Sequence, residues 1–267
     1  MTVRLAWATD VHFNFPSERG IEGFAHDVME RDADALVISG DIAESHDFPG
    51  YLEALANFLQ RPIYFVLGNH DRYRGSIART SERARRISRS NPWLWWLPDV
   101  GVIELSPTVA LLGHDGWADG RLGDYDGSTV ALNDYSLISE LSGLTHHARR
   151  KVLRRLGDQA ANHVREHLPQ AMERFPRQVV FVTHVPPFRE ACWRDGQPCD
   201  DQWLPHFSCG AVGEALVEVV EAHPQGNLLV LCGHTHGWGE ARIGTNVKVL
   251  TGGARYGEPS VAQVFEF

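Results

Sequence analysis

The sequence has no long hydrophobic run, no internal repeat and few cysteines. No apolar stretch in its 267 residues approaches the ~18 residues that a membrane span requires, so we expect no membrane segment. The residues after Met1 lead directly into the first motif, which predicts that no signal peptide is present and that the protein is cytoplasmic. Four cysteines are too few for a disulfide scaffold at this length.

Positive charge is also scarce. The chain has 25 Lys and Arg against 34 Asp and Glu, which gives a net charge of −9. Because long nucleic acid is bound through basic patches that release counterions, this balance argues against long nucleic acid as a partner. It does not exclude a small phosphorylated ligand, since bound cations would dominate the local field. The composition is that of a globular protein, and we expect one α/β domain over residues 1–267.

Short apolar runs alternate with helical patterns along the first part of the chain. The runs stop at Gly, Asp or His, as strands buried on both faces do, and they cover residues 3–8, 35–39, 63–67, 109–112, 179–183 and 228–232. The first half therefore predicts parallel β-α-β-α-β units, with reactive groups at the carboxyl ends of the strands. Residues 247–251 and 261–267 predict strands with no helix between them, which indicates a second, mixed or antiparallel sheet.

Five strand ends carry side chains that bind metal ions. They are Asp10-Val11-His12, Gly40-Asp41, Gly68-Asn69-His70-Asp71, Thr183-His184 and Gly233-His234-Thr235-His236. Residues two apart in an extended segment share one face, and a carboxylate such as Asp41 can bridge two ions. This mixture of oxygen and nitrogen donors suits Mn, Fe or Zn better than Ca or Mg. Each position alone could be a capping Asp, a turn Asn or a packed His, but their joint occurrence favours one metal centre.

The ordered set resembles the calcineurin-like metallophosphoesterase superfamily, whose pattern is D-x-H, G-D, G-N-H-[D/E], H and G-H-x-H. Every element is present, from Asp10 to His236. The resemblance implies a four-layer α/β/β/α sandwich with two central mixed sheets. It also implies two ions that share Asp41, one held by Asp10, His12, Asp41 and His236, and the other by Asp41, Asn69, His184 and His234.

The resemblance further implies how the site would react. A water bridging the two ions would ionise near neutral pH and attack a phosphorus held in line with it. His70 would protonate the leaving oxygen or stabilise the transition state, and Asp71 would orient and charge His70. Some relatives that cleave lipid-linked diphosphates have Arg at the position of His70, so this residue disfavours that substrate class.

The predicted function is hydrolysis of a small phosphomonoester or phosphodiester by a binuclear metal-dependent enzyme. A cyclic nucleotide phosphodiesterase and a nuclease of the same superfamily stay open as alternatives. A non-catalytic scaffold is the alternative from another class, but such relatives usually lose ligands or the catalytic histidine. The sequence does not give the substrate, the native metals or the oligomeric state.

Several residues outside the motifs are candidates for shaping the substrate pocket. Arg72 begins an arginine-rich stretch that otherwise predicts a solvated helix, His114 would be a pocket wall, and Arg255 follows the Gly252-Gly253 turn. The polar segment from about 117 to 151 predicts either a lid over the active site or a surface insertion. The Trp-rich run at 91–98 could stack a nucleobase or pack under a loop. A second metal site or a disulfide among Cys192, Cys199 and Cys209 is a further alternative.

Overall fold

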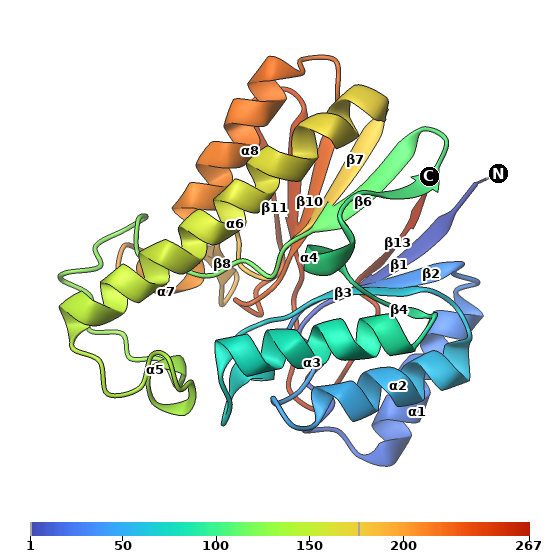
Figure 1. Cartoon of the computed structure of the whole chain (residues 1–267), viewed down its shortest axis with the longest axis horizontal. Coiled ribbons are helices and arrows are strands. Elements are labelled where there is room, and N and C mark those ends of the chain that lie inside the picture. Colours follow the sequence, from blue (N-terminus) through green and yellow to red (C-terminus); the bar gives the residue numbers. More distant parts are fainter. Residues whose placement is uncertain (1, 176) are drawn as a thin grey trace.

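The computed structural model describes residues 2–175 and 177–267 and contains two large β-sheets (Figure 1). The first sheet has the order β13-β1-β2-β3-β4, with strands β1 (Arg4–Ala8), β2 (Ala35–Ser39), β3 (Ile63–Val66), β4 (Leu94–Trp96) and β13 (Gln263–Glu266). β1 to β4 run parallel, and β13 pairs antiparallel to β1. Every residue of β2 and β3 is buried, as the continuous apolar runs predict for strands covered on both faces.

The second sheet has the order β11-β12-β10-β7-β6-β5. Its strands are β5 (Ile103–Ser106), β6 (Val109–Gly113), β7 (Gln178–Val182), β10 (Leu228–Cys232), β11 (Gly239–Ile243) and β12 (Val247–Thr251). The four central strands are parallel, and the edge strands β5 and β11 are antiparallel to their neighbours. The sheet is therefore mixed, as expected.

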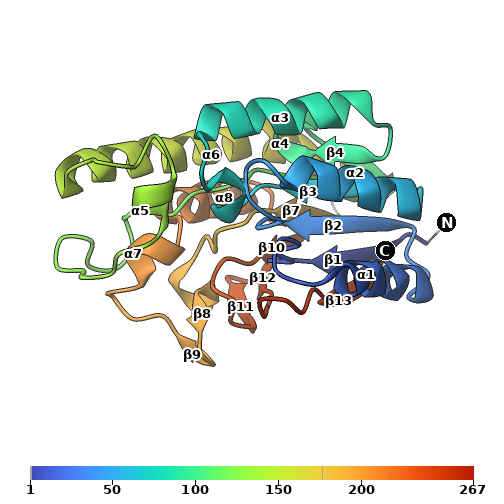
Figure 2. The same cartoon turned by 90° about the horizontal axis from the view of Figure 1, so that it is seen from below.

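Helices cover the outer face of each sheet. On the first sheet, α1 (Glu18–Glu30), α2 (Phe48–Leu59) and α3 (Ile77–Ser90) bury residues such as Phe24, Leu52 and Ile87 in one cluster with Ile38 and Phe65. On the second sheet, the long helix α6 (His146–Arg174) packs beside α8 (Gly210–Ala222) over β7 and β10. Figure 1 shows α6 and α8 on one side of the two sheets and α1, α2 and α3 on the other, and in Figure 2, seen from below, α1, α2 and α3 lie in front of the sheets.

The two sheets pack against each other through a third apolar cluster. It contains Trp7 and Val66 from the first sheet and Leu111, Val180 and Leu231 from the second, all of them buried. Burial of this inner layer by hydrophobic contact fixes how the sheets face each other. The architecture is the expected four-layer α/β/β/α sandwich, with the carboxyl ends of β1, β2, β3, β7 and β10 leading into the predicted ligand motifs.

The last strand lies in a different sheet from the one predicted for it. β12 belongs to the second sheet, but β13 crosses to the edge of the first sheet and pairs with β1. The Trp-rich run forms β4 and the start of the short helix α4 (Leu97–Val100), so these tryptophans extend a sheet and do not lie under a loop. The remaining short elements are η1 (His70–Arg72), α5 (Asp134–Leu137), η2 (Arg189–Ala191), β8 (Trp193–Arg194), β9 (Gln197–Pro198) and α7 (Leu204–Phe207).

The segment from 117 to 151 has more packing than its polar composition predicts. Tyr125, Ile138 and Leu141 are buried in a separate cluster with Tyr73 and Leu153. Its last residues belong to α6, which begins at His146. The loop part therefore ends near 145 and is held to the body by apolar contacts. Within the described residues, no helix is long and apolar enough to cross a membrane.

Candidate metal centre

The predicted ligands lie in loops that leave strand ends, and their backbone is unusual. Five of them adopt a positive φ, which is uncommon outside glycine: Asp10 (50°), His12 (42°), Asp41 (53°), His234 (71°) and His236 (57°). Such conformations persist only where surrounding structure holds them, and they concentrate at functional sites. Each turn aims a ligand side chain at the space between the two sheets' carboxyl ends.

Motif glycines allow the ligand loops to approach each other. A Cβ at Gly68 would lie 2.1 Å from Asp41 Oδ1, and a Cβ at Gly233 would lie 2.1 Å from Asp10 Oδ2. Neither glycine has a positive φ, so the backbone conformation does not require glycine at these positions. Glycine is required because the Asp side chains approach the backbone too closely for a Cβ atom to fit. The Gly-Asn and Gly-His pairs of the motifs thus bring Asp10 and Asp41 within reach of the neighbouring loops.

The first group of ligands contains Asp10, His12, Asp41 and His236. One possible ligand atom from each lies within 4.8 Å of the others. The Nε2 atoms of His12 and His236 are 3.1 Å apart, and His236 Nε2 is 3.4 Å from Asp10 Oδ1. All but His236 are almost completely buried. These distances match the spacing of ligand atoms around one ion.

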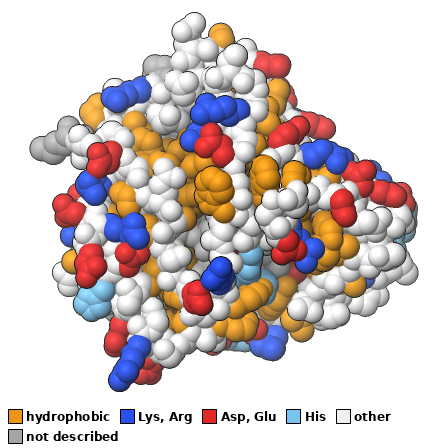
Figure 3. Space-filling view, turned by 180° about the vertical axis from the view of Figure 1, so that it is seen from behind, with side chains coloured by type: hydrophobic (Ala, Val, Ile, Leu, Met, Phe, Trp, Pro, Cys, Tyr) orange, Lys and Arg blue, Asp and Glu red, His pale blue; other side chains and the backbone are white. Residues whose placement is uncertain are grey.

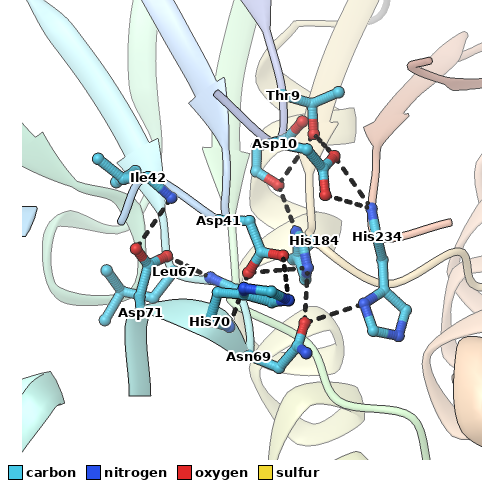
Figure 4. Close-up of polar contacts among 12 residues, drawn as sticks. Thr9, Asp10, Asp41, Ile42, Leu67, Asn69, His70, Asp71, His184 and His234 are labelled. Atoms are coloured by element: carbon cyan, nitrogen blue, oxygen red, sulfur yellow. Dashed lines mark hydrogen bonds and ion pairs between the residues drawn. The ribbon is translucent and has the colours of Figure 1, made fainter. Parts of the chain in front are cut away.

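The second group meets at the side-chain oxygen of Asn69. Asn69 Oδ1 is 3.1 Å from His184 Nε2 and 3.0 Å from His234 Nδ1 (Figure 4). His184 Nε2 also lies 3.4 Å from Asp41 Oδ1, and Asp41 Oδ2 lies 3.8 Å from His12 Nε2. Asp41 therefore stands between the two groups with one oxygen toward each, as a bridging carboxylate would.

Each of the two histidines of the second group forms an outward hydrogen bond through one ring nitrogen. The other ring nitrogen, with its free lone pair, then faces the centre. His184 Nδ1 donates to the carbonyl of Ser39 at 2.9 Å, and His234 Nε2 donates to the carbonyl of His206 at 3.1 Å. A neutral imidazole that donates from one nitrogen presents the other as an acceptor, which is the form that binds a metal ion. The residues present therefore fit the two ions that the motifs imply.

The charges of the centre also favour the binding of cations. In the described ranges, the ion-pair partners of Asp10 and Asp41 are histidines, with no Lys or Arg among them. Burial opposes ionisation of Asp41, yet His184 and His70 hold its pKa well below the usual value. Burial lowers the pKa of His12 and of His234 to about 4, so both are neutral near pH 7. Two buried carboxylates that have no Lys or Arg partner in the described ranges form a site for positive ions.

His70 lies beside the ligands without belonging to either group of donor atoms. Its Nε2 is 3.9 Å from Asp41 Oδ2, and its ring packs against His12 and Tyr73 with centroid distances of 4.6 and 4.2 Å. The ring is part of the wall of an open cavity of about 720 Å³ that also reaches Asp41, Asn69, His234 and His236. This position is compatible with a histidine that does not bind metal, which stays a prediction.

Asp71 does not have the surroundings that its predicted role requires. Its Oδ1 accepts hydrogen bonds from the backbone amides of Ile42 and Ala43, both at 2.9 Å, and its Oδ2 accepts from Gly68 at 2.8 Å (Figure 4). The carboxylate is fully buried. It ties the loops after β2 and β3 together, so we correct its role from orienting His70 to holding these two ligand loops.

Two of the three predicted substrate contacts are directed elsewhere. Arg72 is buried, donates to Asp115 Oδ2 at 2.7 Å and to the carbonyl of Ile77 at 2.9 Å, and is absent from the cavity wall. His114 accepts from the amide of Gly116 at 3.1 Å and packs against His163. Both side chains serve packing inside the fold, because the strand end after β6 and the turn after η1 face each other there.

The third predicted contact, Arg255, lies in the wall of the metal cavity and is largely exposed. Sequence reasoning missed other members of this wall, above all Arg194 and Trp238. Trp238 is 66% exposed, which is unusual for a large apolar side chain and marks the rim of the cavity. Trp238 could have been predicted to lie near the site from its position two residues after the predicted ligand His236. Arg194 comes from the β8–β9 hairpin, which no motif indicated.

Residues 131–134 of the polar segment also line the cavity. This position is compatible with a lid, which stays a prediction. The cysteine alternative gains no support, because all four cysteines are free and buried.

The comparisons with known proteins agree with this geometry. Residues 3–238 match the profile of the calcineurin-like phosphoesterase family. No curated protein matches the sequence significantly.

Similar solved structures share the fold at low identity. A phosphopantetheinyl hydrolase from Mycobacterium tuberculosis has a TM-score of 0.65 at 14% identity, covering 95% of this chain and 89% of its own. A dimetal phosphatase from Danio rerio has a TM-score of 0.58 at 13% identity, covering 94% and 87%. A Thermus thermophilus protein has a TM-score of 0.57 at 13% identity, covering 100% and 99%. Since the family profile spans most of the chain, this protein belongs to the calcineurin-like phosphoesterase family.

Proposed function

We propose that the protein is a binuclear metal-dependent hydrolase of small phosphomonoesters or phosphodiesters. The observation that carries the proposal is the convergence of seven ligand side chains in two groups that share Asp41, at the wall of a cavity open to solvent. When bound, two ions of Mn, Fe or Zn would supply Lewis-acid binding of phosphate oxygens and lower the pKa of a water molecule.

The ligand residues, His70 and two arginines would have different roles in this reaction. Asp10, His12 and His236 would hold one ion, Asn69, His184 and His234 the other, and Asp41 both. His70 stands in the cavity wall beside Asp41, where its ring nitrogen could donate a proton to a leaving oxygen. Arg255 and Arg194 line the same cavity and could pair with a second anionic group of the substrate.

The size and charge of the surroundings favour a small substrate. On the face seen in Figure 3, Lys and Arg side chains are interspersed with Asp and Glu, so no continuous basic track for a long polyanion is visible there. A non-catalytic scaffold would need neither the full ligand set nor His70. A cyclic nucleotide phosphodiesterase is compatible with the same cavity and is separated by the substrate test.

The test starts from protein stripped with a chelator and reloaded with Mn²⁺, Fe²⁺ or Zn²⁺. Metal analysis should approach two equivalents per chain, and the loaded protein should hydrolyse members of a panel of mono-, di- and cyclic phosphoesters. Asp41→Asn should lose most of the activity, because the bridge places both ions. Asp126→Asn is the matched control, since Asp126 is exposed and pairs with Arg150. One equivalent or fewer after loading, or an inert panel, would contradict the proposal.

A further inference from the structure

The amide group of Asn69 is held from behind by two side chains outside the ligand motifs. Asn69 Nδ2 donates to Asp134 Oδ1 at 2.8 Å and to the hydroxyl of Tyr73 at 3.2 Å. Tyr73 in turn donates its hydroxyl proton to Asp134 Oδ1 at 2.8 Å. All three residues are buried, with Asp134 only 4% exposed. The three side chains form a closed triangle on the side of Asn69 opposite the two histidines.

The chemistry of this triangle fixes which end of the amide faces the metal centre. A carboxylate can only accept hydrogen bonds, so Asp134 must face the NH₂ end of Asn69. The oxygen end is then turned toward His184 Nε2 and His234 Nδ1, at 3.1 and 3.0 Å. If the amide were rotated by half a turn, its NH₂ group would face the ions, and that group is not a metal ligand. Asp134 and the Tyr73 hydroxyl, as acceptors behind the NH₂ group, thus favour the orientation in which the oxygen faces the centre.

Among Asn69, His184 and His234, only Asn69 has side chains as its outward partners. The partners of His184 and His234 are the backbone carbonyls of Ser39 and His206. Asp134 instead begins α5, within the polar segment that joins β6 to α6. This segment thus contributes directly to a group of residues that the ligand motifs otherwise supply.

Asp134 has few other reasons to be buried. Its side-chain hydrogen bonds in the described part of the chain come from Asn69 and Tyr73, both neutral, and it forms no ion pair with the described Lys and Arg residues. Burying a carboxylate without a cationic partner is unfavourable. Nearby bound cations would offset that cost, which is consistent with a role toward the metal centre.

We propose that Asp134 is a positioning residue of the metal centre, which with the Tyr73 hydroxyl fixes Asn69 so that its oxygen binds the second ion. The inference rests on the proposed function, since it takes Asn69 as a ligand. Tyr73 links the same network to His70, because the two rings pack at a centroid distance of 4.2 Å. The segment from 117 to 145 would therefore contribute to the metal site as well as to the wall of the cavity.

Metal affinity measured without substrate tests this inference. Metal-free wild type, Asp134→Ala, Asp134→Asn and Tyr73→Phe are each titrated with Mn²⁺ by calorimetry, with the spin-coupled Mn²⁺ pair followed by electron paramagnetic resonance. Asp134→Ala should lower the affinity for one of the two ions by about 10- to 100-fold, which is the usual effect of removing an outer partner of a ligand. The affinity for the other ion should stay unchanged. Asp134→Asn keeps an acceptor oxygen and should stay within several-fold of wild type. Tyr73→Phe should lie between them.

The control and the contrary outcomes separate positioning from general destabilisation. Asp126→Ala, in the same segment but exposed and paired with Arg150, should bind both ions as wild type does. Wild-type affinity for both ions in folded Asp134→Ala would overturn the inference, and so would equal losses in the Ala and Asn variants. If Asp134→Ala does not fold, the Asp134→Asn and Tyr73→Phe variants decide. A strong loss of metal affinity in Asp134→Asn, together with no loss in Tyr73→Phe, would overturn the inference.

The inference and the proposed function fail in different ways. Wild-type protein that binds two ions with the expected Asp134 dependence but hydrolyses no phosphoester contradicts only the proposed function. Active protein whose metal affinity ignores Asp134 contradicts only the inference. Wild-type protein that binds fewer than two ions contradicts both.

Discussion

His70 and Asn69 are neighbours in the chain, yet their side chains have different surroundings. Asn69 points its oxygen at two histidines, whereas the His70 ring lies between the rings of His12 and Tyr73 in the cavity wall. The short helix η1 begins at His70, so the chain turns between the two residues. In the proposed function, one side chain would thereby be available to a metal and the next to a substrate.

Replacing His70 with Asn should separate these roles. We expect His70→Asn to keep both metal ions and to lose about 10²- to 10⁴-fold in rate on alkyl phosphoesters, the usual span for a general acid. The loss should be smaller for nitrophenyl esters, whose leaving group needs little protonation. Steady-state rates on both ester types and metal analysis measure the effect. Equal losses on both ester types would indicate electrostatic stabilisation, and loss of metal would make His70 a ligand.

His184 should release a proton when metal binds. Burial disfavours its charged form, but Asp41 and Asp10 raise its pKa to about 10 in the metal-free protein. The residue is therefore protonated near neutral pH, whereas a ligand nitrogen must be free of its proton. Affinity for the ion bound by His184 should fall about tenfold for each pH unit below the pKa of about 10, one proton being displaced. Calorimetric titrations in buffers of different ionisation enthalpy count the protons, and a count of zero at pH 7 would contradict the assignment.

At the level of elements, a buried ion pair joins the turn after β3 to the end of β6. Arg72 donates to Asp115 Oδ2, while Asp115 Oδ1 accepts from the Leu67 amide at 2.8 Å and from Trp96 Nε1 at 3.0 Å. These contacts connect the two sheets close to the ligand loops. The arginine-rich stretch after Arg72 forms α3, where Arg85 and Arg89 pair with Asp99 at the surface.

Removing one partner of the buried pair should destabilise the fold strongly. We expect Asp115→Ala to lower the free energy of unfolding by about 3–5 kcal/mol, because it leaves Arg72 buried without its partner. Urea unfolding of the metal-free protein measures the change. Arg85→Ala is the control, since its exposed pair with Asp99 should contribute about 0–1 kcal/mol. A loss in Asp115→Ala no larger than that of the control would show that the pair does not join the sheets.

At the scale of the whole molecule, the metal centre lies where both sheets end. Asp10, Asp41 and Asn69 follow strands of the first sheet, while His184 and His234 follow strands of the second. Bound ions would thus connect the two halves of the sandwich. Asp10 and Asp41 are buried in this site, with histidines as ion-pair partners.

Metal removal should therefore lower the stability of the entire domain. Ions at 100 times their dissociation constant should raise the free energy of unfolding by about 2.7 kcal/mol for each site. Thermal unfolding with Mn²⁺ and with chelator measures the difference as a shift in Tm. His236→Ala should show a smaller shift than wild type, because one ion loses a ligand. An identical Tm with and without metal would contradict binding at the junction of the sheets.

The sequence by itself determined the central buried strands and the set of motif residues that the structure brings together, and the resemblance carried by those motifs implied the four-layer architecture. Continuous apolar runs indicate buried strands, and the ligand residues directly follow these runs in the sequence. Both features can therefore be predicted without knowledge of tertiary contacts. The same local reading failed for Asp71 and Arg72, because it places a side chain near its sequence neighbours. In the fold, these two face backbone amides and Asp115 instead.

Only the tertiary structure decided the contacts between distant segments. Asp134 meets Asn69 across 65 positions, and β13 pairs with β1 at the opposite end of the chain. No periodicity or motif encodes such a pairing, since it depends on how the apolar faces of separate elements pack together. The partners that orient the ligands and the wall of the cavity follow from that packing, because hydrogen bonds and pocket shape are fixed only once the two sheets are in contact.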